Sequence, residues 1–291
     1  MVSLLPQLIL TGLTVGSIYA LVALGFVLIY NVTGILNFAQ GEFSMLGALL
    51  CATLLGWHLS LPLAALVAVA AVCLIGAAME RLTIEPAFGS HPLTLIIITF
   101  GVSMAFRGLS LMIWGADPYT LPEFTPGPAL QLLGGVLVRQ AMWAIGLSIA
   151  VVLGLFLFFS RSVPGAAVRA CADNAFACRL LGISPRRMSL VAFTLSAGLG
   201  AVAGIVSAPI TGATYDMGLS LGLKGFVAAV IGGLTNAPAA VVGGYLVGLI
   251  ESLTTGYLTP GYSGAITFLV LLLVLVIQRE GLLHAAQRRQ A

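Results

Sequence analysis

The sequence predicts an all-α membrane protein whose helices cross the lipid bilayer and pack as one bundle. Of its 291 residues, 60% are hydrophobic and 7% are charged, whereas a soluble domain carries about 25% charged residues. Its apolar runs approach the ~20 residues that a helix needs to cross the hydrocarbon. The 35 glycines also suit membrane helices, in which small residues allow close packing. The runs are unbroken, which excludes the alternating pattern of a membrane β-barrel.

Eight apolar runs are predicted to cross the membrane as helices, within one domain over 1–291. They are 7–30, 41–57, 61–80, 93–114, 139–160, 188–210, 237–257 and 262–278. A ninth, shorter run over 222–234 is either a tilted crossing or one half of a broken helix. The sequence therefore predicts about 8–9 crossings and leaves open whether 222–234 crosses.

Basic residues predict which side of the membrane each loop occupies, because cytoplasmic loops are enriched in Lys and Arg. Segment 161–187 carries five arginines against one acidic residue, Asp173, and is predicted to be cytoplasmic. The loop 115–138 carries Asp117 and Glu123 and fits the outside. The side of the N-terminus is left open. The C-terminal tail is predicted to be cytoplasmic from Arg279, Arg288 and Arg289.

The basic segment is predicted to contain a short helix near 165–182 that lies outside the membrane. Pro164 suits its first turn, and Gly182 suits the residue that ends it. Arg169 and Asp173 form an i,i+4 pair on one face. An apolar stripe on a neighbouring face consists of Val168, Ala172, Phe176 and Leu180. Two interpretations remain: an amphipathic helix lying on the membrane surface, or a helix that docks into a partner domain.

Four polar side chains interrupt the apolar sequence between the first two runs. Non-helical backbone at membrane depth persists only where it is buried in protein or lines a cavity. The interruption predicts part of a translocation pathway or gate, with a plain interfacial loop as the alternative. The four residues are Asn31, Asn37, Gln40 and Glu42. Glu42 must face protein or water, and it either fixes this segment or caps the helix that begins near Gly41.

A second interruption lies nearer the C-terminus, where Gly232, Gly233 and Pro238 break the apolar sequence. Paired interrupted segments, one in each half of a transporter, point to its translocation site. Lys224 and Glu251 lie on either side of this break. They are predicted to pair with each other or with Glu42, and to belong to the same pathway or gate.

Small residues at every fourth position predict two close-packing helix faces. Gly200 and Gly204 mark one face, and Gly244 and Gly248 mark the other. The chain contains no nucleotide-binding P-loop, no GxSxG and no HExxH, and its three histidines share no ligand spacing. Neither ATP hydrolysis nor a metal site is therefore predicted in this chain.

Three stretches together resemble the H-type permease subunits of branched-chain amino acid ABC importers. Residues 16–46 contain GSIYALVALGF and NFAQGEFSMLGA, residues 169–183 read RACADNAFACRLLGI, and residues 223–251 contain LKGF and IGGL. The family usually carries His where this chain has Gln40. The resemblance covers most of the chain, and it is more specific for the family than for the substrate, because relatives carry urea, short amides or aromatic acids.

The resemblance implies a type II-like importer permease of the bacterial inner membrane that moves branched-chain or related apolar amino acids. It implies as partners a second, M-type permease, two cytoplasmic ATPase subunits that bind ATP and Mg²⁺, and a periplasmic binding protein, with no cofactor on this chain. The residues that would couple to the ATPase are Arg169, Asp173, Ala175, Phe176, Leu181 and Gly182. A secondary transporter or channel that works alone is the alternative, but it has no use for a docking helix. An intramembrane enzyme is disfavoured, because no paired catalytic residues occur at membrane depth.

Overall fold

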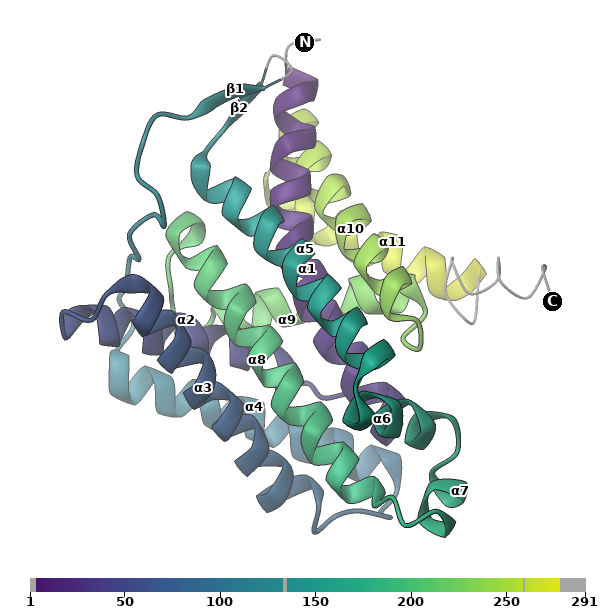
Figure 1. Ribbon diagram of the computed structural model, residues 1–291. Helices are drawn as coiled ribbons and strands as arrows, with labels where there is room; N and C mark the ends of the chain where they lie inside the picture. Colours follow the sequence, from purple (N-terminus) through teal and green to yellow (C-terminus); the bar gives the residue numbers. More distant parts are fainter. Residues whose placement is uncertain (1–3, 133–134, 259, 278–291) are drawn as a thin grey trace.

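The computed structural model describes residues 4–132, 135–258 and 260–277, and most of them lie in helices (Figure 1). Within that part of the chain a helix forms at each of the eight predicted runs and at the shorter ninth run. These helices are α1 (Leu4–Thr33), α2 (Gln40–Gly56), α3 (Leu61–Met79), α4 (Pro92–Trp114), α5 (Arg139–Arg161), α8 (Pro185–Thr211), α9 (Met217–Gly232), α10 (Ala237–Tyr257) and α11 (Ser263–Ile277). A π-helical turn, η1 (Glu80–Ile84), extends α3, and a 3-10 turn, η2 (Pro260–Tyr262), precedes α11.

Six of the described helices are long and apolar enough to span a membrane: α1, α3 with η1, α4, α5, α8 and α10. Helices α9 and α11 are apolar but shorter, and α2 has 17 residues. The predicted helical membrane bundle is therefore confirmed. Arg279, Arg288 and Arg289, on which the side of the C-terminal tail was predicted, lie outside the described residues.

A short β-hairpin departs from the predicted all-helical fold. Strand β1 (Leu130–Leu132) pairs antiparallel with β2 (Gly135–Leu137) in the loop between α4 and α5. The Val136 N–H donates to Gln7 Oε1 at 2.7 Å, which attaches the hairpin to the start of α1. Strands of three residues carry too little alternation to be found by periodicity.

The two ends of the bundle differ in character (Figure 1). The hairpin and the start of α1 lie at one end, which we call the hairpin end. The basic segment lies at the opposite end as two short helices, α6 (Val163–Asp173) and α7 (Ala175–Leu180), and we call this the α6–α7 end. The loop predicted to be outside and the segment predicted to be cytoplasmic thus occupy opposite ends of the bundle.

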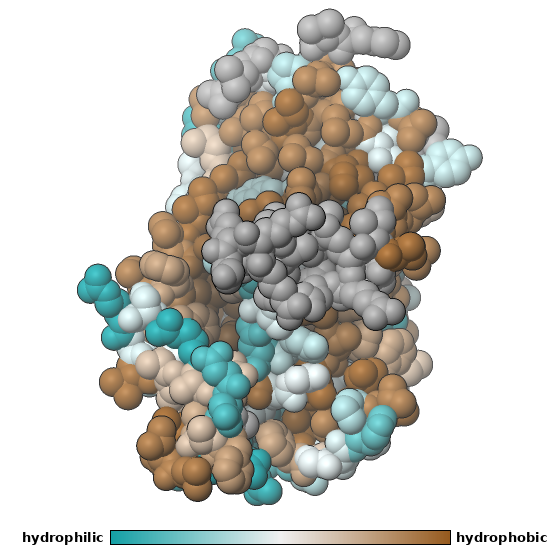
Figure 2. All heavy atoms as spheres, turned by 90° about the vertical axis from the view of Figure 1, so that its right-hand side faces the viewer, coloured by the Kyte–Doolittle hydropathy of each residue, from teal (hydrophilic) through white to brown (hydrophobic). Residues whose placement is uncertain are grey.

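Helix α1 lies at the centre of the bundle, packed against α5, α8, α9 and α10. Its most apolar stretch is 89% buried, compared with 17% in α4 and 11% in α5. The outer helices instead expose large apolar side chains such as Leu74, Met112 and Phe156. Figure 2 shows one face that is mostly hydrophobic, with a group of hydrophilic residues in its lower half. Such a surface fits lipid or another protein.

Helices α2 and α9 begin inside the bundle rather than at its ends. The first residue of α2, Gln40, lies against Gly25 of α1, and the next residue, Gly41, lies against Gly218 of α9. From this meeting point α2 runs toward the hairpin end, where Thr53 Oγ1 accepts a hydrogen bond from the Trp114 indole at 2.7 Å. The first interruption predicted from sequence therefore meets the start of α9, whereas the predicted break at Gly232 and Gly233 lies at the other end of α9.

Helix α9 runs from the same meeting point toward the α6–α7 end. Just beyond its last turn, Thr235 O accepts a hydrogen bond from Asn31 Nδ2 at 3.2 Å, at the end of α1. Gly233 ends α9 in the left-handed conformation with φ of 91°, and Pro238 stands in the first turn of α10, as the predicted break requires. The short run over 222–234 is thus one helix that returns the chain between α8 and α10.

Close helix contacts run through glycines. A Cβ at Gly204 of α8 would collide with the backbone carbonyl of Ser44 in α2, and Gly200 faces the same helix. Gly244 and Gly248 of α10 face the backbone of α1 in the same way. At these four positions the absence of a side chain is what lets the two backbones approach.

The predicted single helix near 165–182 is wrong, because the chain breaks at Asn174. This residue leaves the helical backbone with φ of −154° and ψ of 93°, and its side chain accepts a hydrogen bond from Ala177 N at 2.9 Å. Asn favours such N-cap positions over helix interiors, because its side chain competes for backbone N–H groups. Pro164 in the first turn of α6 and Gly182 with φ of 78° agree with the predicted ends of the segment.

Candidate functional site

The connection between α1 and α2, residues 34–39, places Glu42 in the interior of the bundle. The Glu42 side chain is 1% exposed, and its Oε1 accepts hydrogen bonds from Ser103 Oγ and Arg107 Nη2 of α4, both at 2.9 Å. Glu42 faces protein, as the cost of a charge in lipid requires. Its charged partner is Arg107 rather than Lys224. The N-cap of α2 is Ala39, so Glu42 lies in the first turn and is not the capping residue.

The second oxygen of Glu42 lies against the start of α9, where a Cβ on Gly218 would collide with it. One carboxylate thus connects the first turns of α2 and α9 to α4, and it faces the positive end of the α9 dipole. Sequence reasoning missed Ser103 and Arg107. The available signal was Arg107 itself, since an arginine inside an apolar run needs a partner.

The other three polar residues of the first interruption, Asn31, Asn37 and Gln40, do not join Glu42. The Gln40 side chain donates to Ser196 O at 3.0 Å and accepts from the Ser196 hydroxyl, which ties α2 to α8. Asn37 Oδ1 accepts from Ala39 N at 3.1 Å and turns the connection into α2. Asn31 is at the α6–α7 end of α1. Gln40 and Asn37 are fully buried, so in this conformation they hold the helices together and line no open path.

Lys224 and Glu251 form a second polar site, on α9 and α10. Lys224 Nζ lies 2.6 Å from Glu251 Oε1, and the Tyr19 hydroxyl of α1 donates to Oε2 at 2.7 Å. Of the pairings that the sequence left open, the structure shows the one between Lys224 and Glu251. Tyr19 is a partner that sequence reasoning missed, because tyrosine in an apolar helix carries no local signal of such a contact.

A row of phenylalanines borders the meeting point of the interrupted helices. Phe26 of α1 contacts Phe226 of α9, Phe226 contacts Phe38 of the connection, and Phe38 contacts Phe100 of α4, with ring centroids 5.7–5.9 Å apart. These rings join four elements by apolar contacts alone.

The α6–α7 segment exposes large apolar side chains at its end of the bundle. Phe176 is 71% exposed, and Leu180 and Leu181 are 75% and 78% exposed. The predicted stripe is therefore wrong, since Val168 is buried whereas Phe176 and Leu180 point outward. The break at Asn174 changes the direction of the helix, so one stripe cannot continue across it.

Arg169 and Asp173 lie on the exposed surface of α6. None of the ion pairs among the described residues joins them, so the predicted i,i+4 pair is wrong. Both charged side chains are instead exposed at the surface of the protein. Charged and large apolar side chains exposed together on such a short segment are typical of a surface that binds another protein.

Two buried thiols hold α6 and α7 together. Cys171 and Cys178 lie on the inner side of the segment. Burial, with a smaller contribution from the adjacent Cys178 thiol, raises the pKa of Cys171 to about 11, so this thiol remains protonated at neutral pH. A buried neutral thiol packs as a small hydrophobic group and is a poor nucleophile.

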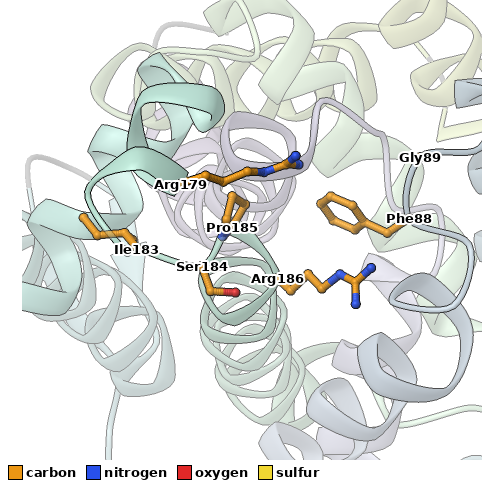
Figure 3. Close-up of a pocket in the computed structure, with 8 residues that line it drawn as sticks. Phe88, Gly89, Arg179, Ile183, Ser184, Pro185 and Arg186 are labelled. Carbon is orange, nitrogen blue, oxygen red and sulfur yellow. The ribbon is translucent and has the colours of Figure 1, made fainter.

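A cleft of about 620 Å³ separates this segment from the loop that follows η1. Figure 3 shows Arg179 and Arg186 extending toward Phe88 across the cleft. Arg186 Nη1 also lies 3.9 Å from Glu85 Oε1. The two arginines make the cleft basic and suit it to an acidic surface. Among the residues that the structure describes, no cluster of His, Cys, Asp and Glu is arranged to hold a metal ion.

An apolar helical bundle with interrupted helices at buried charges, and with an exposed segment at one end, defines a membrane transport permease. The family model described as "Branched-chain amino acid transport system / permease component" matches residues 8–275. The chain belongs to this family, and within it to the H-type permeases.

Curated relatives agree with this assignment, and a solved structure shares the fold. BraD of Pseudomonas aeruginosa, a high-affinity branched-chain amino acid transport system permease protein, is 33% identical over 95% of each chain. The corresponding protein LivH of Escherichia coli K12 is 30% identical, over 95% of this chain and 94% of LivH. The structure of PsaBC from Streptococcus pneumoniae in complex with Fab aligns with a TM-score of 0.51 and 14% identity over 91% of this chain and 89% of the other. This last likeness concerns the fold alone.

Proposed function

We propose that this chain is the H-type transmembrane subunit of an ABC importer for branched-chain amino acids. Its partners would be an M-type permease, two ATPase subunits that hold ATP and Mg²⁺, and a periplasmic binding protein. The observation that carries the proposal is the exposed α6–α7 segment, whose apolar and basic side chains have no role in a protein that works alone. Its place opposite the hairpin end agrees with an ATPase on one side of the membrane and a binding protein on the other.

Affinity purification of the tagged chain tests this assembly. An importer subunit should bring down a second permease and an ATPase after solubilisation in mild detergent. A stand-alone transporter or channel would purify by itself and would still carry leucine in proteoliposomes without ATP. That result would contradict the proposal, and leucine analogues, urea, short amides and aromatic acids tested in the same vesicles would identify the substrate.

The proposed topology has nine crossings, in a type II-like importer fold within a bacterial inner membrane. The start of α1 would face the outside, because the hairpin is attached to it through Gln7. The chain then reaches α6 and α7 on the cytoplasmic side after α1, α2, α3, α4 and α5. Helices α8, α9, α10 and α11 bring it back to that side. In this proposal α9 also crosses the membrane and brings the number of crossings to nine. The start of α1 and the end of α11 then lie on opposite sides of the membrane.

Single cysteines introduced into a cysteine-free chain should report this topology. We expect Ala129→Cys, in the exposed loop before the hairpin, to react with a membrane-impermeant maleimide in spheroplasts. Ala172→Cys, on the exposed face of α6, should react only after the membrane is permeabilised. Both alanines are exposed, so access to the reagent decides the result. The reverse pattern would invert the proposed orientation.

Asp173→Ala should reduce ATP-driven uptake while leaving the fold unchanged. Asp173 is exposed and makes no ion pair among the described residues, so its loss should change stability by less than about 0.5 kcal/mol. Asp117→Ala, in the opposite loop, is the matched control. Uptake and ATP hydrolysis by the reconstituted complex should fall for Asp173→Ala alone. Intact assembly and intact transport by this variant would show that Asp173 takes no part in coupling.

A further inference from the structure

The Lys224–Glu251 pair lies half way through the bundle rather than at one of its ends. Tyr19, which binds Glu251, stands near the midpoint of α1 (Leu4–Thr33). Lys224 is the one lysine of the chain, and it stands in the middle of α9 (Met217–Gly232). Charges at this depth are costly in lipid, and they mark pathways or protein contacts.

This pair also borders the outside of the subunit. The Lys224 and Glu251 side chains are 21% and 16% exposed, and Ser220, one turn earlier on the same face of α9, is exposed as well. Unlike Glu42, whose side chain is 1% exposed, both members of this pair keep an exposed part. The exposed side of Lys224 and Glu251 must therefore meet water or another polar partner.

An amino acid carries the same two charges as this pair, an ammonium and a carboxylate on one carbon. We infer that Lys224 and Glu251 form the headgroup subsite of the translocation pathway, where Glu251 binds the ammonium and Lys224 the carboxylate of the passing amino acid. The inference rests on the proposed function and assigns residues to it. Without an amino acid bound, the two residues neutralise each other, so neither charge of the pair is left unpaired.

The residues around the pair would let Lys224 and Glu251 release each other and bind the amino acid instead. The Tyr19 hydroxyl holds Glu251 Oε2 at 2.7 Å, so this carboxylate keeps a donor when the lysine moves away. The Lys224 ammonium stands 5.5 Å from the centre of the Tyr19 ring, a cation–π contact that remains available to it. Leu221, one turn earlier on α9, is partly buried and offers an apolar surface for the side chain of the amino acid.

Photolabelling of the purified permease–ATPase complex, without binding protein, tests the subsite. The probe is photo-leucine, a diazirine amino acid with both charged groups, and peptides of α9 and α10 are the expected labelled sites. Leucine should compete with the probe. Leucinamide, which lacks the carboxylate, and 4-methylpentanoate, which lacks the ammonium, should each compete on the order of 30-fold less well, the loss typical of removing one partner of a buried charge pair.

The variants assign each charge to its residue. With Lys224→Met, leucinamide should compete as well as leucine, and with Glu251→Gln, 4-methylpentanoate should do so. The double variant Lys224→Gln/Glu251→Gln leaves neither charge unpaired, so it can be used if the single variants do not fold. It should lose the preference for leucine over leucinamide and over 4-methylpentanoate. Arg139→Met, at the hairpin end, is the control that should keep them. Unchanged preferences in the double variant, or labelling confined to other helices, would overturn the subsite. A wild-type complex that neither binds nor imports leucine would instead contradict the proposed function.

Discussion

Gly204→Leu should prevent the bundle from assembling. A Cβ at this position of α8 would already collide with the Ser44 carbonyl of α2, so a leucine must force the two helices apart. Overpacking typically costs about 1–3 kcal/mol where side chains can move aside. Here the obstacle is backbone, and we expect a loss of more than about 3 kcal/mol, which is a large share of a typical stability. The yield of monodisperse protein and its thermal unfolding measure this effect.

Gly146→Leu provides the matched control, because it adds the same side chain to another apolar helix. A Cβ at Gly146 of α5 would meet no atom within 4 Å, and the position is exposed. This variant should give protein with the yield and unfolding temperature of the wild type. If Gly204→Leu behaved like Gly146→Leu, the close contact between α2 and α8 would be wrong.

Much of the fold could be predicted from sequence because membrane helices carry their signal locally. The predicted runs 93–114 and 237–257 differ by at most one residue from α4 (Pro92–Trp114) and α10 (Ala237–Tyr257). A proline in the first turn and a long apolar run can both be recognised within each segment. The break between α6 and α7 was missed although Asn174 is a good capping residue, because its neighbours favour a helix and the apolar spacing appeared continuous.

The candidate site could be predicted in its residues but only partly in its contacts. Glu42, Lys224 and Glu251 were found because charges are rare in apolar sequence. Their partners Arg107 and Tyr19 lie 65 and 232 residues away along the chain, and no periodicity relates positions so far apart. Only the packing of α1, α4, α9 and α10 decides which polar side chains meet.

Helix α9 links the two charged sites. Its first turn lies against Glu42 through Gly218, and two turns later Lys224 binds Glu251. The first contact joins α9 to α2, and the second joins α9 to α10. A movement of α9 would therefore change both sites together, which is the arrangement expected of a gate next to a pathway.

A second large effect is expected for Arg107→Leu. The substitution leaves the Glu42 carboxylate, 1% exposed, without its cation. Removing one partner of a buried ion pair costs about 3–5 kcal/mol, because the remaining charge is uncompensated. Adding Glu42→Gln to the same chain removes that charge and should restore much of the yield and thermal stability. Losses that simply add in the double variant would show that Glu42 and Arg107 are not energetically coupled.

Glu42→Gln alone then separates a gating role from a structural one. Glutamine keeps the shape of the side chain and can still accept from Ser103, while Arg107, 25% exposed, can turn toward water, so the complex should assemble. An interaction with a helix dipole alone is worth about 0.3–1 kcal/mol and predicts nearly normal uptake. If Glu42 fixes the first turns of α2 and α9 as part of the gate, most ATP-driven leucine uptake in proteoliposomes should be lost. Glu123→Gln, in the loop between α4 and α5, should transport normally as the control. Normal uptake by Glu42→Gln would exclude the gating role, because the charge that links α2, α4 and α9 would then be dispensable for transport.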